Sequence, residues 1–142
     1  MTQKNSTMEK ELRITNDLKE ITVLVDFVKD LCEELALPIE TEMNINLALE
    51  EAVVNVIMYA YPVQEPHDIL LKVSFDENQL IFLLTDRGYF FDPTVVADAD
   101  LTLSIEERPI GGFGIFLIRR IMNEVSYQRL DDENQLTMKK SL

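Results

Sequence analysis

The chain is poor in the residues that cross-link proteins and lacks the apolar runs that cross membranes. Cys32 is the single cysteine among 142 residues, so no disulfide can form within the chain. It lies in an amphipathic helical pattern, which predicts that it packs as a small apolar group and is compatible with a reducing cytoplasm. No stretch approaches eighteen apolar residues and the N-terminus has no apolar core, so we expect neither a membrane span nor a signal peptide.

Positive charge is also scarce. Lys and Arg number 13 against 26 Asp and Glu, which gives a formal net charge of -13 and a pI near 4.4. Such a surface repels nucleic-acid phosphates and anionic lipids, so we expect neither nucleic acid nor membrane as a partner. The length suits one domain that buries a core without cross-links. We place this domain at residues 8–142, behind a polar and mobile segment 1–7.

The pattern of apolar residues predicts alternating blocks of strands and helices. We expect a strand at 9–15, followed by a helix that Asn16 or Asp17 caps and that runs to about Leu37. A core helix around 47–62 comes next, which Thr41 can cap, and strands at 68–76 and 79–85 follow it. The rest of the chain is predicted to form an irregular span at 94–110, a helix at 115–124 and a final hairpin with its turn at 131–134. This order predicts an α+β fold, a two-layer α/β sandwich. We expect a mixed, mainly antiparallel sheet covered on one face by about three helices.

The core helix carries two polar side chains in an otherwise apolar segment. Glu51 and Asn55 stand four residues apart in LALEEAVVNVIMYAYP, so they lie on one face, one turn from each other. A carboxylate and an amide that face a protein interior are costly unless they are paired, solvated or bound to a ligand. One interpretation is a site for hydrated Mg²⁺ and its bound phosphates. The alternative is a buried structural pair joined by a hydrogen bond.

Two glycine-bearing segments follow. Asp86 comes directly after an apolar strand and precedes Gly88 by two positions, so the carboxylate could accept a hydrogen bond from the amine of an adenine ring while the glycine leaves room for it. An ordinary turn is the alternative. Gly111, Gly112 and Gly114 precede a predicted helix, where free backbone N–H groups favour phosphate. Their spacing matches neither a Rossmann motif nor a P-loop.

Taken together, these motifs resemble a known family. Glu-x-x-x-Asn, Asp-x-Gly-x-x-Phe-Asp-Pro and Gly-Gly-x-Gly-Ile-x-Leu-Ile occur in the order of the N box and the two glycine boxes of the GHKL ATPases. The length and the ending GGFGIFLIRRIMNEVSYQRL are most similar to the anti-sigma-factor serine/threonine kinases of the RsbW type. The resemblance extends roughly from Leu12 to Lys140. It implies a Bergerat-type ATP-binding fold with ATP and Mg²⁺ as cofactors.

The resemblance implies a role for each residue of the first two motifs. Asn55 would coordinate Mg²⁺, and Glu51 would act as the general base or position the attacking group. Asp86 would bind the adenine amino group, with Gly88 beneath the ring.

The last motif and its surroundings would contact the phosphates. Gly112 and Gly114 would place backbone amides near them, and residues 94–110 would form a mobile lid. Arg108 on that lid would reach the terminal phosphate. Thr137 on the last strand would contact the adenine through water.

The function implied by the resemblance is a Mg-ATP-dependent protein serine/threonine kinase. It would phosphorylate an anti-anti-sigma partner of the STAS type and sequester a sigma factor, and relatives of this type form homodimers. One alternative is a nucleotide-gated binding module without kinase activity; another is a regulatory ATPase without a protein acceptor. His67, the only histidine, falls in a turn, which argues against a complete histidine kinase.

Overall fold

The computed structural model describes residues 8–61, 65–95 and 114–142. Its elements are β1 (Met8–Thr15), a 3₁₀ turn η1 (Leu18–Glu20), α1 (Ile21–Glu34), α2 (Ile39–Tyr59), β2 (Asp68–Asp76), β3 (Gln79–Asp86), a second 3₁₀ turn η2 (Pro93–Val95), α3 (Gly114–Ile121), β4 (Glu124–Leu130) and β5 (Glu133–Ser141). The order of strands and helices expected from the sequence is confirmed, with boundaries moved by a few residues.

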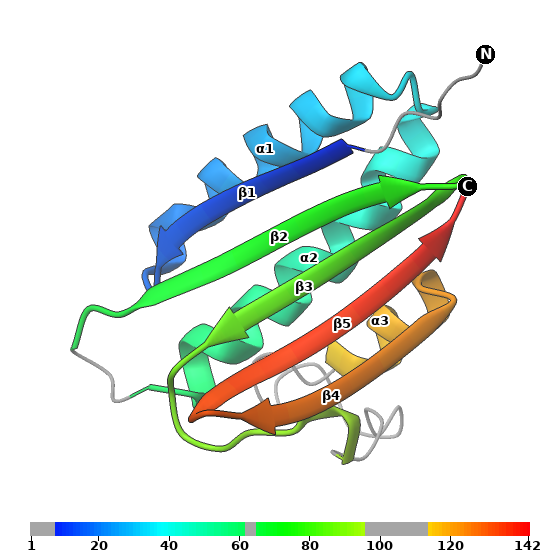
Figure 1. Ribbon diagram of the computed structural model, residues 1–142. Helices are drawn as coiled ribbons and strands as arrows, with labels where there is room; N and C mark the ends of the chain where they lie inside the picture. Colours follow the sequence, from blue (N-terminus) through cyan, green and yellow to red (C-terminus); the bar gives the residue numbers. More distant parts are fainter. Residues whose placement is uncertain (1–7, 62–64, 96–113) are drawn as a thin grey trace, which may run out of the picture.

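The strands form one sheet in the order β1-β2-β3-β5-β4. Figure 1 shows α1, α2 and α3 on the same face of this sheet, so the predicted two-layer α+β sandwich is confirmed. We expected some parallel pairing, but the four pairings between described strands are antiparallel. Two helices separate β1 from β2 and so return the chain in the opposite direction. Strands β3 and β4 run parallel, but β5 lies between them, and α3 is the α-helix that the described residues place between them in sequence.

Both hairpins close with tight turns. Residues 77 and 78 have φ of 52° and 62°, and residues 131 and 132 have φ of 54° and 63°. Two successive positive φ values define the type I′ turn, which matches the twist of antiparallel strands and which Asn and Asp tolerate. The second turn is shorter than the 131–134 turn expected from the sequence. Asn134 therefore belongs to β5, where it pairs with Asp86 of β3.

The core helix begins earlier than expected. α2 starts at Ile39, directly after Pro38. The φ of -63° and ψ of 155° of Pro38 are those of an extended residue, so Pro38 lies outside the helix. Thr41 lies inside the helix, so its predicted role as the cap was wrong. The start of α2 has no side-chain cap, but Glu40 and Glu42 in the first turn favour the positive end of the helix dipole.

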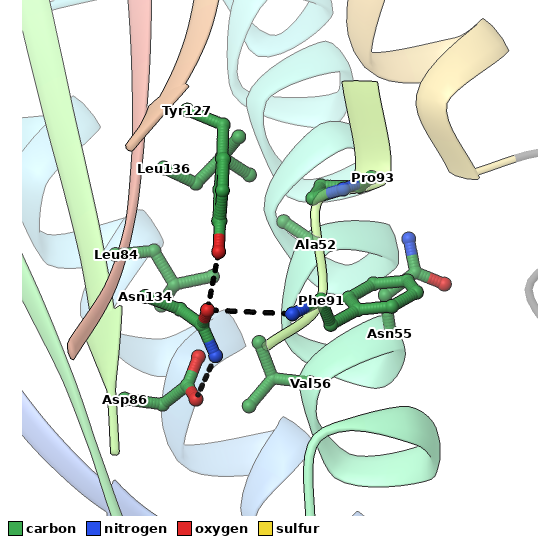
Figure 2. Close-up of a pocket in the computed structure, with 10 residues that line it drawn as sticks. All are labelled: Ala52, Asn55, Val56, Leu84, Asp86, Phe91, Pro93, Tyr127, Asn134 and Leu136. Atoms are coloured by element: carbon green, nitrogen blue, oxygen red, sulfur yellow. Dashed lines mark hydrogen bonds between the residues drawn. The ribbon is translucent and has the colours of Figure 1, made fainter. Parts of the chain in front are cut away.

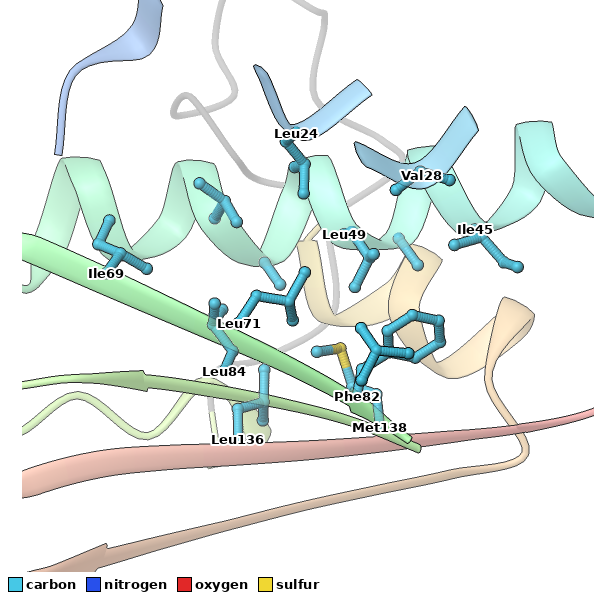
Figure 3. Packing of buried hydrophobic residues seen from close by; sticks show 14 of the residues in the cluster. Leu24, Val28, Ile45, Leu49, Ile69, Leu71, Phe82, Leu84, Leu136 and Met138 are labelled. Carbon is cyan, nitrogen blue, oxygen red and sulfur yellow. The ribbon is translucent and has the colours of Figure 1, made fainter. Parts of the chain in front are cut away.

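The hydrophobic core lies between the sheet and the helices (Figure 3). Alternate residues of the central strands face it, which are Leu80, Phe82 and Leu84 in β3 and Leu136 and Met138 in β5. The same alternation carries Asp86 and Asn134 onto the helix-covered face at the end of the sheet. Among the described residues, no helix has the combined length and apolarity that crossing a bilayer requires.

Candidate functional site

A narrow pocket lies between α2 and the ends of the central strands (Figure 2). Its walls come from α2, β3, the segment after β3, and the β4–β5 hairpin: Ala52, Asn55, Val56, Leu84, Asp86, Phe91, Pro93, Tyr127, Asn134 and Leu136. Figure 2 shows Asp86 and Asn134 on the sheet side and Asn55 on the helix side, with Phe91 between them. The cavity volume is about 20 Å³, which holds about one water molecule.

Asp86 is the carboxylate among the described residues that line this pocket, and 5% of its surface is exposed. Its Oδ1 accepts hydrogen bonds from the backbone N of Gly88, at 2.8 Å, and from Nδ2 of Asn134, at 2.9 Å. Burial raises the pKa of Asp86, while these two hydrogen bonds act in the opposite direction. Both donors engage the same oxygen, so the described residues leave Oδ2 available as an acceptor.

Glu51 lies on the flank of α2 and lacks a partner for one of its oxygens. Within the described part of the chain, its Oε2 is buried and makes no hydrogen bond. Burial raises the pKa of Glu51, and the neighbouring charge of Glu50 raises it further. A buried carboxylate oxygen without a partner is costly. Oε2 of Glu51 is therefore available to accept a hydrogen bond or a proton.

Asn55 lies one turn beyond Glu51, is 6% exposed, and lines the pocket. In the ranges that the structure describes, no group of three or more His, Cys, Asp or Glu side chains could hold a metal ion. Mg²⁺ in nucleotide sites is held by one or two protein oxygens together with phosphate oxygens and water. The amide oxygen of Asn55 fits an ion that arrives with a nucleotide.

Gly88 is held against the end of α2. A Cβ on this residue would lie 2.1 Å from the carbonyl oxygen of Ala60. The backbone N of Tyr89 donates a hydrogen bond of 2.6 Å to the same oxygen. The absence of a side chain at Gly88 is therefore required by contact with the helix, independently of any ring bound in the pocket.

Asp92, the second aspartate of the motif that begins at Asp86, also has a structural role. Its Oδ1 accepts hydrogen bonds from the backbone N and the hydroxyl of Thr94, at 2.8 and 2.6 Å, and so caps η2. Arg119 of α3 donates to the carbonyl oxygen of Thr94 at 2.7 Å. These contacts attach the segment after β3 to α3.

Some of the residues predicted from the sequence lie outside the described residues. Arg108, Gly112 and the lid beyond Val95 are among them. Gly114 is the first residue of α3.

Thr137 is not brought to the pocket. It alternates along β5 with Leu136 and Met138, which are buried in the core, so its side chain lies on the sheet face away from the helices. Thr137 pairs with Leu83 of β3, and the adjacent pair Leu136 and Leu84 lines the pocket. Of the residues proposed to contact the base, Asp86 and Gly88 lie together and Thr137 lies apart.

Asn134 is the pocket residue that the sequence interpretation missed. It is 4% exposed, and its Nδ2 donates to Oδ1 of Asp86 and to the carbonyl oxygen of Tyr89, at 2.9 and 2.8 Å. Its Oδ1 accepts from the hydroxyl of Tyr127 at 2.5 Å and from Nη1 of Arg129 at 3.0 Å. A type I′ turn at the preceding Asp-Asp pair, followed by strand alternation, was the sequence signal that could have placed it.

A larger cavity of about 380 Å³ lies at the same end of the sheet. It is lined by Arg13, Tyr61, His67, Asp68, Leu70, Thr85, Asp86, Arg87 and Glu133. Its cations already lie near carboxylates, with Arg13 3.4 Å from Asp68 and Arg87 3.6 Å from Glu133. It does not contain Asn55, which lines the narrower pocket, and Glu51 lines neither of the two. We therefore assign the candidate site to the narrower pocket, despite its smaller volume.

Comparison with known proteins bears on the family of the chain. The family model described as "Histidine kinase-like ATPase domain" matches residues 14–140. The chain is 31% identical over 95 residues to the serine/threonine-protein kinase BtrW of Bordetella bronchiseptica, an alignment that covers 67% of each chain. It is 26% identical over 99 residues to the serine-protein kinase RsbW of Bacillus cereus, covering 67% of this chain and 60% of that protein.

A solved structure supports the fold. The crystal structure of the RsbU and RsbW domains of Rv1364c from Mycobacterium tuberculosis superposes with a TM-score of 0.66 at 12% identity. The match covers 94% of this chain and 32% of that one. Because the family model spans most of the sequence and the fold agrees with it, the chain belongs to the histidine kinase-like ATPase domain family.

Proposed function

We propose that this protein is a Mg-ATP-dependent protein serine/threonine kinase. The observation that carries the proposal is the buried Oε2 of Glu51, which has no hydrogen-bond partner among the described residues. Glu51 lies one helical turn from Asn55, which lines the pocket together with Asp86. The names of the relatives BtrW and RsbW support the same activity. The chain covers 60% of the RsbW relative, so the activity and partners remain our proposal.

The two ends of the pocket suit the two ends of ATP. Oδ2 of Asp86 would accept a hydrogen bond from the adenine amine, and the amide oxygen of Asn55 would bind Mg²⁺ held by the phosphates. Mg²⁺ would neutralise phosphate charge, which matters in a chain with a net charge of -13. The cavity of about 20 Å³ is too small for a purine, so its walls would have to move apart when the nucleotide enters.

Glu51 would act on the acceptor hydroxyl. A Ser or Thr oxygen of a partner protein bonds to the terminal phosphorus, the bond from that phosphorus to the bridging oxygen breaks to release ADP, and the hydroxyl proton passes to Glu51. Burial raises the pKa of Glu51, which brings it closer to the working pH of a general base. We assign Arg108 to the terminal phosphate and the backbone amides of Gly112 and Gly114 to the phosphate chain, as the resemblance implies.

The acceptor would be another protein. Resemblance to the RsbW type favours an anti-anti-sigma protein with a STAS domain as the phosphorylated partner and a sigma factor as the sequestered one. The STAS partner would present its hydroxyl to Glu51. A mixture of this chain with candidate STAS proteins and [γ-³²P]ATP tests this choice directly.

Calorimetric titration with ADP, with and without Mg²⁺, tests the site. We expect wild-type protein to bind Mg-ADP and Asn55→Ala to lose the Mg²⁺-dependent part of the affinity. Asn44→Ala, at an exposed position of the same helix, is the matched control and should bind as wild type does. Wild-type protein that binds neither nucleotide would overturn the proposal.

Phosphoryl transfer tests the activity separately. Glu51→Gln should keep nucleotide binding and lose labelling of the STAS partner. If wild-type protein binds Mg-ATP but labels no candidate partner, the protein is a nucleotide-gated binding module instead. Steady release of phosphate without a labelled protein would indicate a regulatory ATPase.

A further inference from the structure

The side-chain amide of Asn134 has no capacity left for a ligand. Its two N–H groups go to Oδ1 of Asp86 and the carbonyl oxygen of Tyr89. Its oxygen accepts from Tyr127, Arg129 and, at 3.4 Å, the backbone N of Phe91. If this buried amide flipped, it would lose every partner except the Tyr127 hydroxyl, which can accept as well as donate. Asn134 therefore acts through the groups it holds rather than by touching a base.

The same amide determines which oxygen of Asp86 is free. Asn134 and the backbone N of Gly88 both donate to Oδ1, so rotation of the carboxylate is opposed by two hydrogen bonds. Oδ2 is then the oxygen that a bound base would meet. An ionised oxygen can only accept hydrogen bonds, so it attracts an amine and repels a carbonyl oxygen.

The hydrogen bond from Asn134 also favours the ionised form of Asp86. Burial raises the pKa of this carboxyl group, and the Asn134 amide is the largest effect that lowers it. Without the amide, Asp86 would more readily take up a proton. A protonated carboxyl group donates a hydrogen bond, so Asp86 could then bind a base that has a carbonyl oxygen in place of the amine.

We infer that Asn134 is a positioning residue that sets base selectivity, because it holds Asp86 so that one acceptor oxygen faces the bound base. The inference rests on the proposed nucleotide-binding function and extends it to the choice between 6-amino and 6-oxo purines. Arg129 strengthens the arrangement, because its Nη1 donates both to Asn134 and to the carbonyl oxygen of Gly88, at 3.0 and 3.1 Å. The β4–β5 hairpin thus fixes the segment that carries Asp86.

ADP and IDP distinguish the two kinds of base, since they differ only at the 6-position and in the ring protonation that follows from it. We would measure Kd for both with Mg²⁺ on wild type, Asn134→Leu and Tyr127→Phe. Wild type should prefer ADP by at least about 10-fold, as expected where a polar site loses its partner. In Asn134→Leu, the ratio of the Kd for IDP to the Kd for ADP should come close to one. Tyr127→Phe, which removes one donor to Asn134, should lower the same ratio by about 3-fold.

Gln128→Leu is the matched control. Gln128 Nε2 donates to Oε1 of Gln135 at 2.7 Å, a cross-strand pair on the same hairpin that does not line the pocket. Its ADP to IDP ratio should equal that of wild type.

Two results would overturn the inference, and they differ. If Asn134→Leu and Tyr127→Phe weaken both nucleotides equally, the ratio stays constant and Asn134 has only a structural role. In that case the proposed function survives. If wild-type protein binds neither nucleotide, the proposed function fails and the inference fails with it. Tyr127→Phe keeps the test decisive if Asn134→Leu does not fold.

Discussion

Gly88 and the carbonyl oxygen of Ala60 are so close that a Cβ on Gly88 would lie 2.1 Å from that oxygen. The next residue, Tyr89, donates a backbone hydrogen bond to the same oxygen at 2.6 Å. The segment that follows Asp86 therefore caps the C-terminal end of the helix that carries Asn55. The two ends of the candidate site are joined through backbone rather than through flexible side chains.

Gly88→Ala should destabilise the protein. The added methyl group meets backbone that cannot rotate away, so the strand end or the helix end must shift. We expect the free energy of unfolding to fall by about 2–3 kcal/mol, the cost of forcing an extra carbon into a packed site. Urea denaturation followed by circular dichroism measures it. An unchanged midpoint would show that this contact is looser than the structure indicates.

Ala36→Gly should have the opposite effect. Ala36 follows α1 with φ of 55°, a left-handed conformation that costs a residue with a Cβ about 1 kcal/mol. The side chain is exposed, so removing the methyl group loses little packing. We expect a gain of roughly 0.5–1 kcal/mol, measured in the same denaturation experiment. A loss of stability would contradict the assigned backbone conformation.

Glu51→Gln should stabilise the protein in the absence of nucleotide, and the gain should depend on pH. Burial, and then Glu50, raises the pKa of Glu51, so the folded state holds its proton more tightly than the unfolded chain does. Above the raised pKa the charged carboxylate opposes folding, and below the ordinary carboxyl range the penalty disappears. The melting temperature of Glu51→Gln should exceed that of wild type near pH 8 and approach it as the pH falls to 4.

Glu9→Gln, at an exposed position of β1, is the control for that experiment. The melting temperature of Glu9→Gln should equal that of wild type at each pH. Equal melting curves for Glu51→Gln and wild type near pH 8 would contradict the buried, unpartnered state of Glu51.

Cys32 should resist thiol reagents in the folded protein. Burial, with a smaller effect of Glu42, raises the pKa of its thiol to about 11, and the side chain is 1% exposed. The thiolate is the reactive form, so both effects suppress reaction. Labelling with a disulfide reagent at pH 8 should follow the rate of unfolding and accelerate in urea. Rapid labelling of native protein would contradict this prediction.

Removal of Mg²⁺ should weaken stabilisation by nucleotide. A ligand that binds the folded state raises the melting temperature according to its affinity. We expect Mg-ADP to raise the melting temperature of wild type more than ADP with EDTA does, and Asn55→Ala to show the same small increase in both conditions. A Mg²⁺-dependent increase retained by Asn55→Ala would place the metal elsewhere.

The sequence by itself determined the layers of the fold and the main site residues. The almost continuously apolar sequence of β3 and the apolar character of α2 require a buried strand and a covering helix. The spacing of Glu51 and Asn55 places them on one flank of α2 whatever the rest of the chain does. Local periodicity carries these features, because they depend on residues close together in the chain.

Only the tertiary structure decided which residues meet across the pocket. The tight turn at residues 131 and 132 sets the register that places Asn134 opposite Asp86 and leaves Thr137 on the other face of the sheet. A shift of one residue in that turn would have exchanged the two faces. Likewise, the need for glycine at position 88 comes from Ala60, which is distant in sequence and adjacent in space. Strand pairing and close backbone contact join distant parts of the chain, and no local pattern records them.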